Sequence, residues 1–568
     1  MYIDIVPNRK SPPAILLRES IREGKRTLKR TIANLSALSL EQAEAIRAVL
    51  KGEALAPADG LFEIIRSRTH GAVKAITSAM ARLRLSALLG RERSRERDLV
   101  LAMIAARVLE PQSKLATSRS WGHSTLGECF GVEGASEHEL YAAMDWLLAH
   151  QGVIEQRLAK RHLSAGARVL YDLSSSYFEG ECCPLAQRGY SRDGKKGKLQ
   201  VNYGLLTDAR GCPVSISVFE GNTSDPQTLL PQIDKLQQDF ALESVILVGD
   251  RGMISQKQID ALSERSGVEW ITALKGGAIR KLVEAGAIQM DLFDERNLFE
   301  FAHEDFPGER LIVCRNPQLA QLRAHKRRSL LEATTEELQA VQRMVSHGRL
   351  KDPDKIGVRV GRVLNKYKMA KHFVLQIEAE HFAFHIDEEK VAEEAALDGL
   401  YVIRTSLPTA ALSSDDAVRY YKDLSHVEAA FRSLKSDDLQ IRPIHHHSED
   451  RVRAHLFLCM LAYYVKWHMS EAWRGLVFAD EDQQRHAERD PVAPATRSDG
   501  ALLKVATKLL ADGSPAHSFR TLLNELATIV RNTCRRRNPQ ADEPTFRLDT
   551  TPNAKQREAL DLIRAIQL

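Results

Sequence analysis

The sequence lacks the features that mark membrane-spanning and secreted proteins. Its longest apolar run, Leu456 to Val465, is about half of the ~20 residues that a helix needs to cross a bilayer. The N-terminal residues MYIDIVPNRK contain no apolar signal core. With 43% hydrophobic and 27% charged residues, the composition is typical of a globular protein. We therefore expect a cytoplasmic protein with no membrane partner.

Cysteine is scarce, and its few positions exclude two further classes of protein. The seven cysteines are an odd number, lie scattered along 568 residues and form no C-x-x-C pair. A disulfide framework or a zinc ribbon would need an even set at close, regular spacing. The three consecutive histidines His445, His446 and His447 also lack the spacing of a helical metal site. We predict reduced thiols and no structural metal at the histidine triplet.

Excess charge is also small, since the net charge is only +5, but its distribution is uneven. Residues 1–100 hold 19 Lys and Arg against 11 Asp and Glu, a surplus of +8 that exceeds the total for the whole chain. A basic front end on a nearly balanced body suits phosphate binding. The alternating charges of Arg91, Arg93, Arg95 and Arg97 are equally consistent with a solvated helix face.

The chain is too long for one ordinary core, and its patterns divide it into successive regions. Residues 1–38 read as a basic β-hairpin around an R-E-G-K turn. Residues 39–163 show helical periodicity, as in SEHELYAAMDWLLAH with its Ser N-cap, and predict a helical region. The basic surplus of residues 1–100 makes this region a candidate for DNA binding. No recognition helix can be identified within it.

A change of rhythm near residue 164 indicates an α/β core. ARVLYDLSSSYF, QVNYGLLTD and CPVSISVFEG predict three strands, and alternating helices and strands follow to residue 276. This is the element order of an RNase H-like mixed sheet. We expect residues 277–398 to interrupt this core as an α+β insertion, and residues 399–480 to complete it. Residues 481–568 read as a helical C-terminal region.

Two acidic residues of this core occupy unusual positions. Asp172 lies inside the apolar strand V-L-Y-D-L, and Asp250 ends the aliphatic run V-I-L-V-G-D. A carboxylate in such a strand needs a strand end, a partner or a metal ion, because burying it bare is costly. Open α/β sheets place active sites at the carboxyl ends of strands. On position alone, however, such an acid is more often a cap or a salt-bridge partner than a catalytic residue.

A third acid lies on a helix predicted from Ser413 to about Ser436. Its apolar stripe consists of Val418, Tyr421, Leu424, Val427, Phe431 and Leu434. Tyr421, Glu428 and Lys435 are seven residues apart and line one edge of that stripe, with Arg432 one turn beyond Glu428. The helix therefore presents one carboxylate flanked by cations. Three carboxylates brought together repel one another unless divalent cations neutralise them, and oxygen ligands suit Mg²⁺ or Mn²⁺.

Several motifs occur together in an informative order. D-L-S-S-S-Y-F, F-E-G-N-T-S-D-P-Q-T-L, V-G-D-R-G-M, the Tyr421, Glu428 and Lys435 spacing, and R-P-I-x-H follow one another along the chain. Together they resemble bacterial insertion-sequence transposases of the DDE branch that carry a Tyr-Arg-Glu-Lys signature and an insertion before the catalytic Glu. The likeness extends from the N-terminal hairpin to the final P-N-A-K-Q-R-E-A-L segment.

The resemblance implies that Asp172, Asp250 and Glu428, separated by 78 and 178 positions, form one metal-binding catalytic triad. It implies two divalent cations, Mg²⁺ or Mn²⁺, and DNA contacts from Tyr421 and Lys435. The alternatives without a DNA contact are that Tyr421 is an aromatic residue of the packed core and that Lys435 is a solvated surface lysine. One departure stands out: the signature arginine falls at position 424, which is Leu424 here. Arg432 on the next turn is the candidate substitute.

Further DNA contacts are expected from basic side chains near the first two acids. The Gly-rich loop GYSRDGKKGKLQ lies between the first two core strands, where it can grip phosphates or remain a flexible solvated loop. The residues we assign to DNA binding, besides Tyr421, Lys435 and Arg432, are Arg192, Lys195, Lys196, Lys198 and Arg251.

The functional hypothesis is a nucleoid-associated bacterial DNA transposase. It would bind the terminal inverted repeats of an insertion sequence, cleave double-stranded DNA and transfer strands to target DNA, as a homodimer or larger assembly. The first alternative is an inactive or domesticated DNA-binding relative, which only the departure at Leu424 favours. The second is an RNase H-like nuclease without strand transfer, which the basic N-terminal region and the insertion disfavour.

Overall fold

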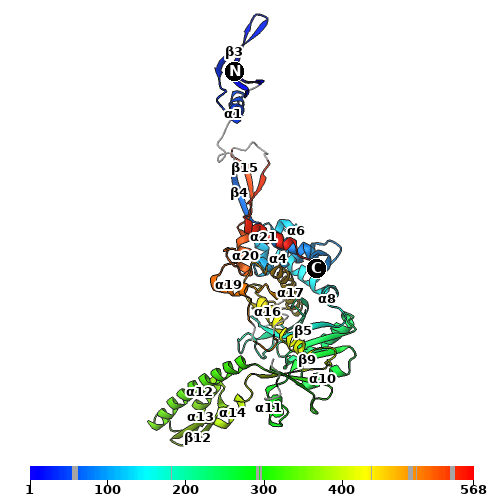
Figure 1. The fold of residues 1–568 in the computed structure, drawn as a ribbon, viewed down its shortest axis with the longest axis vertical. Coiled ribbons are helices and arrows are strands. Elements are labelled where there is room, and N and C mark those ends of the chain that lie inside the picture. The colour runs from blue at the N-terminus through cyan, green and yellow to red at the C-terminus, as the bar shows by residue number, and fades with distance from the viewer. Residues whose placement is uncertain are drawn as a thin grey trace. The chain divides into compact units, whose positions relative to one another are not determined.

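The computed structural model describes residues 1–9, 11–53, 62–180, 182–289, 293, 297–436, 438–483, 490–493, 496–537 and 544–568. The chain divides into two compact units (Figure 1). The first consists of Met1–Arg68 and Val530–Thr551, and the second of Thr69–Ile529 and Pro552–Leu568. The second unit contains every residue that the sequence assigned to a site.

The first unit begins with a three-stranded antiparallel sheet. Its strands are β1 (Tyr2–Val6), β2 (Ala14–Glu23) and β3 (Arg26–Asn34), in the order β1-β2-β3. The predicted hairpin around R-E-G-K is confirmed, with Gly24 in the left-handed region at φ +62°. Helix α1 (Leu40–Leu50), capped by Ser39, packs Ala43 against Ile3 and Ile15.

A second small sheet of this unit is absent from the sequence prediction. It has the order β16-β15-β4 and joins segments more than 460 residues apart. The strands are β4 (Phe62–Thr69), β15 (Val530–Arg536) and β16 (Phe546–Asp549). The expectation of helices alone over 39–163 and 481–568 is wrong here. These strands are short and charged, and their pairing is non-local, so no local periodicity indicates them.

The second unit opens with the helices predicted between 69 and 163. They are α2 (Gly71–Arg82), α3 (Leu85–Leu89), α4 (Arg95–Leu109), α5 (Lys114–Ser120), α6 (Leu126–Phe130), α7 (Glu137–Ala149) and α8 (Gln151–His162). The Ser136 cap is confirmed, since its side chain accepts the Glu139 backbone N–H. These helices share one hydrophobic core with helix α17 (Glu449–Ala472).

Helix α17 carries the longest apolar run of the sequence, Leu456 to Val465, and is buried. Side chains on all of its faces are buried from Val452 to Met469, as expected for a helix without a polar face. It contacts α2, α4 and α7 on the helical side and β7 on the sheet side. In the part of the chain that the structure describes, no helix combines the length and apolarity needed to cross a membrane. Helices α19 (Asp499–Thr507), α20 (Phe519–Ala527) and α21 (Ala554–Arg564) follow it.

A large mixed sheet lies beside these helices. Its order is β10-β11-β14-β9-β8-β5-β6-β7. The strands are β5 (Ala167–Tyr177), β6 (Gln200–Asp208), β7 (Pro213–Glu220), β8 (Val245–Gly249), β9 (Val268–Ala273), β10 (Leu298–Phe301), β11 (Arg310–Arg315) and β14 (Leu400–Thr405). The predicted meander β5–β6–β7 is antiparallel, whereas β8 pairs parallel to both β5 and β9.

Alternating helical segments connect the strands of this sheet. The polypeptide between β7 and β8 forms the 3-10 turn η2 (Asp225–Thr228), helix α9 (Leu229–Asp234) and the π-helical turn η3 (Lys235–Asp239). Helix α10 (Gln256–Ser263) separates β8 from β9. The alternation predicted from the sequence is therefore present, in a mixed α/β fold.

The range 277–398 contains two kinds of structure. Strands β10 and β11 extend the main sheet, where β11 pairs with β14. The remainder has a core of its own, built by Leu338, Val341, Ile356 and neighbouring apolar residues. Its elements are α12 (Pro317–Ser346), α13 (Pro353–Tyr367), η4 (Ala370–His372), β12 (Phe373–Glu378), β13 (His381–Ile386) and α14 (Glu388–Ala395), while α11 (Gly276–Glu284) precedes β10. The independently packed insertion is thus shorter than the sequence suggested.

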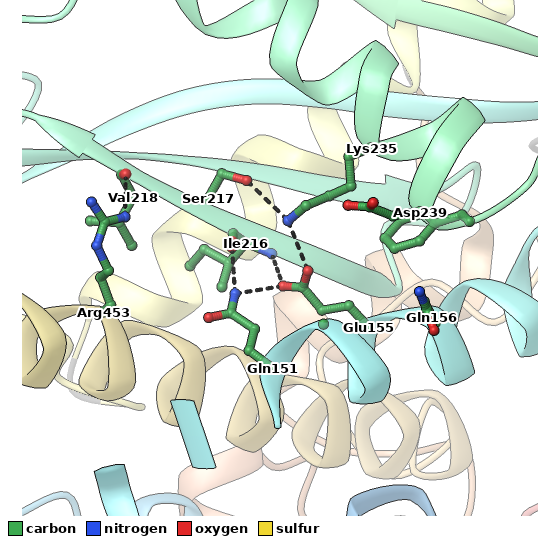
Figure 2. Close-up of a pocket in the computed structure, with 11 residues that line it drawn as sticks. Gln151, Glu155, Gln156, Ile216, Ser217, Val218, Lys235, Asp239 and Arg453 are labelled. Carbon is green, nitrogen blue, oxygen red and sulfur yellow. Dashed lines mark hydrogen bonds and ion pairs between the residues drawn. The ribbon is translucent and has the colours of Figure 1, made fainter. Parts of the chain in front are cut away.

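A buried ion pair joins the helical layer to the sheet. Lys235 Nζ donates to Glu155 Oε2 at 2.8 Å and to Ser217 Oγ at 3.3 Å (Figure 2). It also donates to Ser215 Oγ at 2.9 Å. Glu155 Oε1 accepts from the Ile216 backbone N–H at 3.1 Å and from Gln151 Nε2 at 2.8 Å. The Glu155 side chain is only 1% exposed. Because each of its oxygens has a partner, the charge fixes helix α8 against β7 without being left bare.

Candidate functional site

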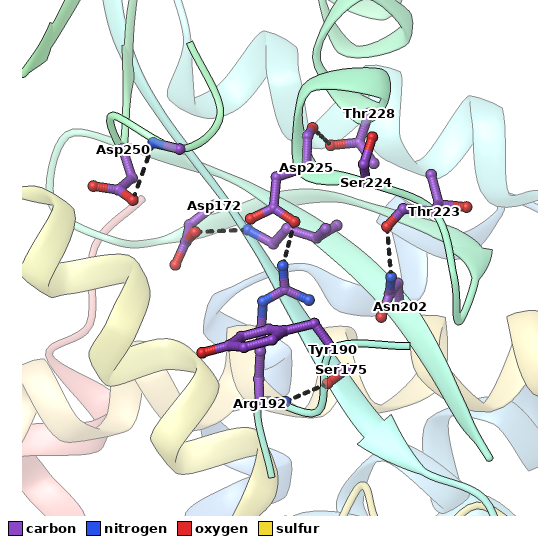
Figure 3. A network of polar contacts seen from close by, with 12 residues as sticks. Asp172, Ser175, Tyr190, Arg192, Asn202, Thr223, Ser224, Asp225, Thr228 and Asp250 are labelled. Atoms are coloured by element: carbon purple, nitrogen blue, oxygen red, sulfur yellow. Dashed lines mark hydrogen bonds and ion pairs between the residues drawn. The ribbon is translucent and has the colours of Figure 1, made fainter. Parts of the chain in front are cut away.

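The register of two parallel strands brings the first two acids together. Tyr171 on β5 pairs with Gly249 on β8, so Asp172 and Asp250 occupy the next positions on adjacent strands. Asp172 lies between the buried residues Tyr171 and Leu173 and is itself partly exposed, because side chains alternate along a strand. Figure 3 shows both carboxylates on the same side of the sheet.

Glu428 lies on the second of two helices that follow β14, and its negative charge acts on Asp172, but among the described residues the three acids do not converge within 4.8 Å of one another. The predicted helix is interrupted at Asp423, which separates α15 (Ser414–Lys422) from α16 (Leu424–Lys435). Arg168 at the start of β5 pairs with Asp423 at 3.1 Å, and its guanidinium lies 3.5 Å from the centroid of the Tyr420 ring. This contact anchors the junction of the two helices to the strand that carries Asp172.

The apolar stripe determines which side of α16 meets the sheet. Five of its six members are buried as the spacing predicts, and Tyr421 is partly buried; the buried ones are Val418, Leu424, Val427, Phe431 and Leu434. Leu424, at the position of the signature arginine, is 9% exposed and belongs to the main core. Glu428 is exposed beside the stripe, and its carboxylate lies 4.0 Å from Arg432.

The carboxylates influence one another electrostatically. Burial, together with the negative charges of Asp250 and Glu428, raises the pKa of Asp172 to about 7. The Leu173 backbone N–H, 2.8 Å from Asp172 Oδ1, and the nearby Arg192 act in the opposite direction. Among the described residues, neither Asp172 nor Asp250 forms an ion pair within 4.0 Å. An all-oxygen set with unbalanced negative charge fits a divalent cation.

Tyr421 contacts the site directly. Its hydroxyl donates to Asp250 Oδ1 at 3.3 Å, while the Gly252 backbone N–H lies 3.4 Å from Asp250 Oδ2. Burial and the Asp250 carboxylate raise the pKa of Tyr421, which therefore remains a neutral hydrogen-bond donor at neutral pH. Arg251 is exposed, and its charge acts on the same hydroxyl. The structure thus places Tyr421 and Arg251 beside Asp250.

Lys435 has a protein partner in this structure. Its Nζ lies 2.8 Å from Asp193 Oδ1, and Arg442 pairs with the same oxygen at 2.5 Å. The Lys435 side chain is 11% exposed and that of Asp193 1%, so the alternative of a solvated surface lysine is wrong. Burial lowers the pKa of Lys435. The direct DNA contact expected of Lys435 remains a prediction.

The basic loop between β5 and β6 is tied to the site at two points. Asp193 accepts the Tyr177 backbone N–H at 3.0 Å in addition to its two cationic partners. Arg192 forms an ion pair with Asp225, and its backbone N–H donates to Ser175 Oγ at 3.0 Å (Figure 3). The loop is therefore held at Arg192 and Asp193, which argues against a wholly flexible segment.

The lysines of this loop are arranged differently from Arg192. Lys195 and Lys196 are exposed, and Lys195 Nζ lies 5.9 Å from the centroid of the Tyr177 ring. Lys198 pairs with Glu179 at 3.2 Å. On α16, Arg432 lies 4.0 Å from Glu428, and both side chains are largely exposed. Four of the predicted contacts are therefore exposed cations, namely Lys195, Lys196, Arg251 and Arg432, whereas Arg192 is paired with Asp225.

Sequence reasoning missed residues of the segment F-E-G-N-T-S-D as part of the site. A pocket of about 400 Å³ beside Asp172 and Asp250 is lined by Tyr190, Arg192, Asn202, Thr223, Ser224, Asp225 and Gly252, among others. Asn202 Nδ2 donates to the Thr223 carbonyl at 3.0 Å. The motif F-E-G-N-T-S-D could have indicated these residues, since it supported the family resemblance. Its position beside Arg192, however, depends on the pairing of β7 with β6.

Comparisons with known proteins give three results. The family model described as "Transposase DDE domain" matches residues 169–465, and the model described as "IS1634 family transposase, N-terminal domain" matches residues 3–59. A solved structure, the cryo-EM structure of the piggyBac transposase synaptic complex with hairpin DNA, has 9% sequence identity and a TM-score of 0.36. The similarity covers 80% of this chain and 76% of that chain. No curated protein matches the sequence.

Proposed function

Because this chain belongs to the insertion-sequence DDE transposases, we propose that Asp172, Asp250 and Glu428 are the catalytic acids with which it cleaves DNA and transfers strands. The observation that carries the proposal is the meeting of Asp172 and Asp250 at paired strand positions, with the charge of Glu428 acting on Asp172. These are three acids from distant parts of the sequence, and all three lie within the range that the DDE family model matches.

We further infer that the core is RNase H-like. Support comes from the three consecutive antiparallel strands β5, β6 and β7, followed by alternating helices and the parallel strands β8 and β9. Strands β14, β11 and β10 extend this sheet beyond β9. The carboxylates would then lie on the side of the sheet to which the carboxyl ends of parallel strands point, where α/β sheets bind their ligands.

The family depends on divalent metal ions, and the three carboxylates are the residues that would hold them. We propose two cations, Mg²⁺ or Mn²⁺, since hard oxygen ligands select such ions over softer metals. Bound there, they would activate a water or a 3′-hydroxyl and stabilise the leaving oxygen of a phosphodiester. Asp172 and Asp250 lack ion-pair partners among the described residues, so their charge is available for this task.

The surrounding residues support two further roles. Tyr421 would orient the Asp250 carboxylate through its hydroxyl. Lys435 would act through Asp193, which it shares with Arg442, and so position the loop that carries Arg192. The exposed basic side chains would bind DNA phosphates, because Lys and Arg contacts to phosphate supply much of the affinity for nucleic acid and fix its position.

The DNA substrate and the assembly belong to the same proposal. We propose that the chain binds the terminal inverted repeats of its element, and that it acts as a homodimer which holds two ends. The basic hairpin β2–β3 lies within the range matched by the IS1634 N-terminal model. An N-terminal unit that is compact in itself, separate from the unit that carries the three acids, suits recognition of the ends.

One experiment tests this function. The purified chain is incubated with Mg²⁺ and labelled duplexes from the two ends of its element, beside the variants Asp250→Asn and Asp260→Asn. Asp260 is an exposed residue of α10 and provides the same chemical change away from the triad. We expect cleavage and joining in the wild type and in Asp260→Asn, and neither in Asp250→Asn.

The alternatives give different results in the same assay. Binding without any cleavage by the wild type would indicate an inactive DNA-binding relative. Cleavage without joining would indicate a nuclease. Cleavage that survives in Asp250→Asn would remove the proposed triad while leaving the family membership intact.

A further inference from the structure

A second cluster of metal-ligating side chains lies away from the acidic triad. It consists of His162 at the end of α8, Cys212 in the turn between β6 and β7, and His468 on α17. One ligand atom from each residue lies within 4.8 Å of the others. Cys212 Sγ is 3.8 Å from His468 Nε2. The three residues are 50 and 256 positions apart along the chain, so only folding brings them together.

The environment of the cluster is built and largely closed. Cys212 is fully buried and His468 is 8% exposed, whereas His162 is partly buried. The turn that carries the thiol is held by Asp208, whose Oδ1 accepts the backbone N–H groups of Cys212 and Arg210, each at 2.9 Å. The cysteine is therefore fixed in position rather than placed on a free loop.

The histidines are positioned in a similar way. Tyr464 lies one helical turn before His468 on α17 and contacts both rings. Its hydroxyl is 3.1 Å from His162 Nε2. Such a partner on one ring nitrogen fixes the orientation of the imidazole and leaves the other nitrogen for a ligand, as around many metal-bound histidines.

The distances are close to those of a tetrahedral zinc site. With Zn–S near 2.3 Å and Zn–N near 2.0–2.1 Å, a sulfur and a nitrogen ligand lie about 3.6 Å apart in a tetrahedron. A thiol-to-imidazole hydrogen bond would also account for the contact between Cys212 and His468. It would not involve the second imidazole, that of His162, whose hydrogen bond is to Tyr464.

We propose that His162, Cys212 and His468 bind one Zn²⁺ ion that joins three elements of the second unit. Two imidazole nitrogens and one thiolate select a borderline-soft ion over Mg²⁺. On binding, the Cys212 thiol releases its proton to solvent, and a water molecule completes the tetrahedron. The negative charge of Asp208 lies near both His162 and Cys212, where it is shared with Arg210, its ion-pair partner at 3.0 Å.

The ion would have a structural task. It would connect the last turn of α8, the β6–β7 turn and the central helix α17, which are the elements that hold the helical layer against the sheet. This role is separate from the acidic triad and does not depend on its chemistry.

Metal content provides the test. The full chain is purified, equilibrated with a small excess of Zn²⁺, desalted and analysed by inductively coupled plasma mass spectrometry. We expect one zinc per chain, and at least about tenfold weaker zinc binding in Cys212→Ser and in His468→Ala. Cys459→Ser is the matched control, because Cys459 Sγ lies 3.8 Å from His455 Nε2, yet this pair belongs to no three-ligand group among the described residues.

The absorption spectrum of the Co²⁺-substituted wild type tests the same site without a variant, and it therefore still applies if a variant does not fold. Replacement of zinc by Co²⁺ should give a thiolate-to-cobalt charge-transfer band and the visible absorption of tetrahedral Co²⁺. Absence of zinc from the equilibrated wild type, or a cobalt spectrum without thiolate character, would overturn the proposal. So would unchanged zinc content in a folded Cys212→Ser variant.

Discussion

Two regions of the second unit treat charged side chains in opposite ways. One is the acidic edge, by which we mean Asp172, Asp250 and Glu428, and the other is the interior around Glu155 on α8. At the edge, Asp172 and Asp250 have no ion-pair partner among the described residues. In the interior, Glu155 is paired with Lys235 and receives three hydrogen bonds in all. Negative charge left unbalanced at an exposed edge is suited to an external cation and its substrate. Charge that is fully paired inside serves the fold.

The largest effect is expected at the acidic edge. Replacement of Glu428 by Gln should lower the rate of DNA cleavage by at least about 10³-fold, because losing one metal ligand removes several kcal/mol of transition-state stabilisation. The thermal midpoint should hardly change, since the Glu428 side chain is 62% exposed. Single-turnover cleavage measures the loss, and Glu264→Gln, an exposed residue directly after α10, is the control. Comparable cleavage rates in the two variants would contradict a catalytic role for Glu428.

The interior pair should show the reverse pattern. Glu155→Ala leaves the Lys235 ammonium without its carboxylate and should lower the free energy of unfolding by about 3–5 kcal/mol. Glu155→Gln keeps hydrogen-bonding atoms and should cost less. Urea unfolding measures both, and cleavage by the folded fraction should remain near the wild-type rate. A loss below about 1 kcal/mol in Glu155→Ala would show that this contact does not hold the layers together.

A buried lysine in the helical layer gives a pH-dependent prediction. Burial, and then the charge of Arg107, lowers the pKa of Lys114 to about 7 from its ordinary 10.5. The folded state therefore binds fewer protons than the unfolded state between these values, and this group makes stability rise with pH across that window. Below pH 7 its penalty is fully present, and above pH 10.5 it is absent.

Lys114→Met should remove this penalty. We expect the variant to be more stable by about 1–3 kcal/mol at pH 7, with the advantage shrinking as the pH approaches 10. Thermal midpoints measured from pH 6 to pH 10 test this, with the exposed Lys74→Met as control. A gain that is constant over the whole range would mean that packing, rather than the lysine charge, is responsible.

The smallest effect separates an exposed cation from a buried one on the same helix. Arg432 is 71% exposed, whereas Lys435 is bound to Asp193. Arg432→Ala should reduce the slope of log affinity against log salt for DNA by about 1, as expected for one lost phosphate contact. Lys435→Met should leave that slope nearly unchanged while lowering cleavage through the displaced loop. Equal changes of slope would place both cations on the DNA.

Local patterns predicted most elements of the second unit. The strands over 167–220, and strand β8 with Asp250 directly after it, occur where the sequence pattern indicated them. The burial of Leu424 also followed from the helical stripe. These features depend on the alternation of apolar residues within one segment, which the sequence displays directly.

Contacts between distant segments could not be predicted in this way. The pairing of β4 with β15, the addition of β10 and β11 to the main sheet, and the burial of Lys435 against Asp193 all depend on how separate segments meet. The same holds for His162, Cys212 and His468, which no short motif connects. None of these partners lies within one turn or one strand of the other, so no local rule applies.

The sequence by itself determined which residues could carry the chemistry of this protein. It showed two acids in apolar strands, a third on a helix edge, and the ordered motifs of an insertion-sequence transposase. The tertiary structure decided which of these acids lie on adjacent strands and which cations remain exposed. It also brought His162, Cys212 and His468 together. The physical reason is that periodicity records the face on which a side chain lies, whereas strand register and helix docking determine what lies opposite that face.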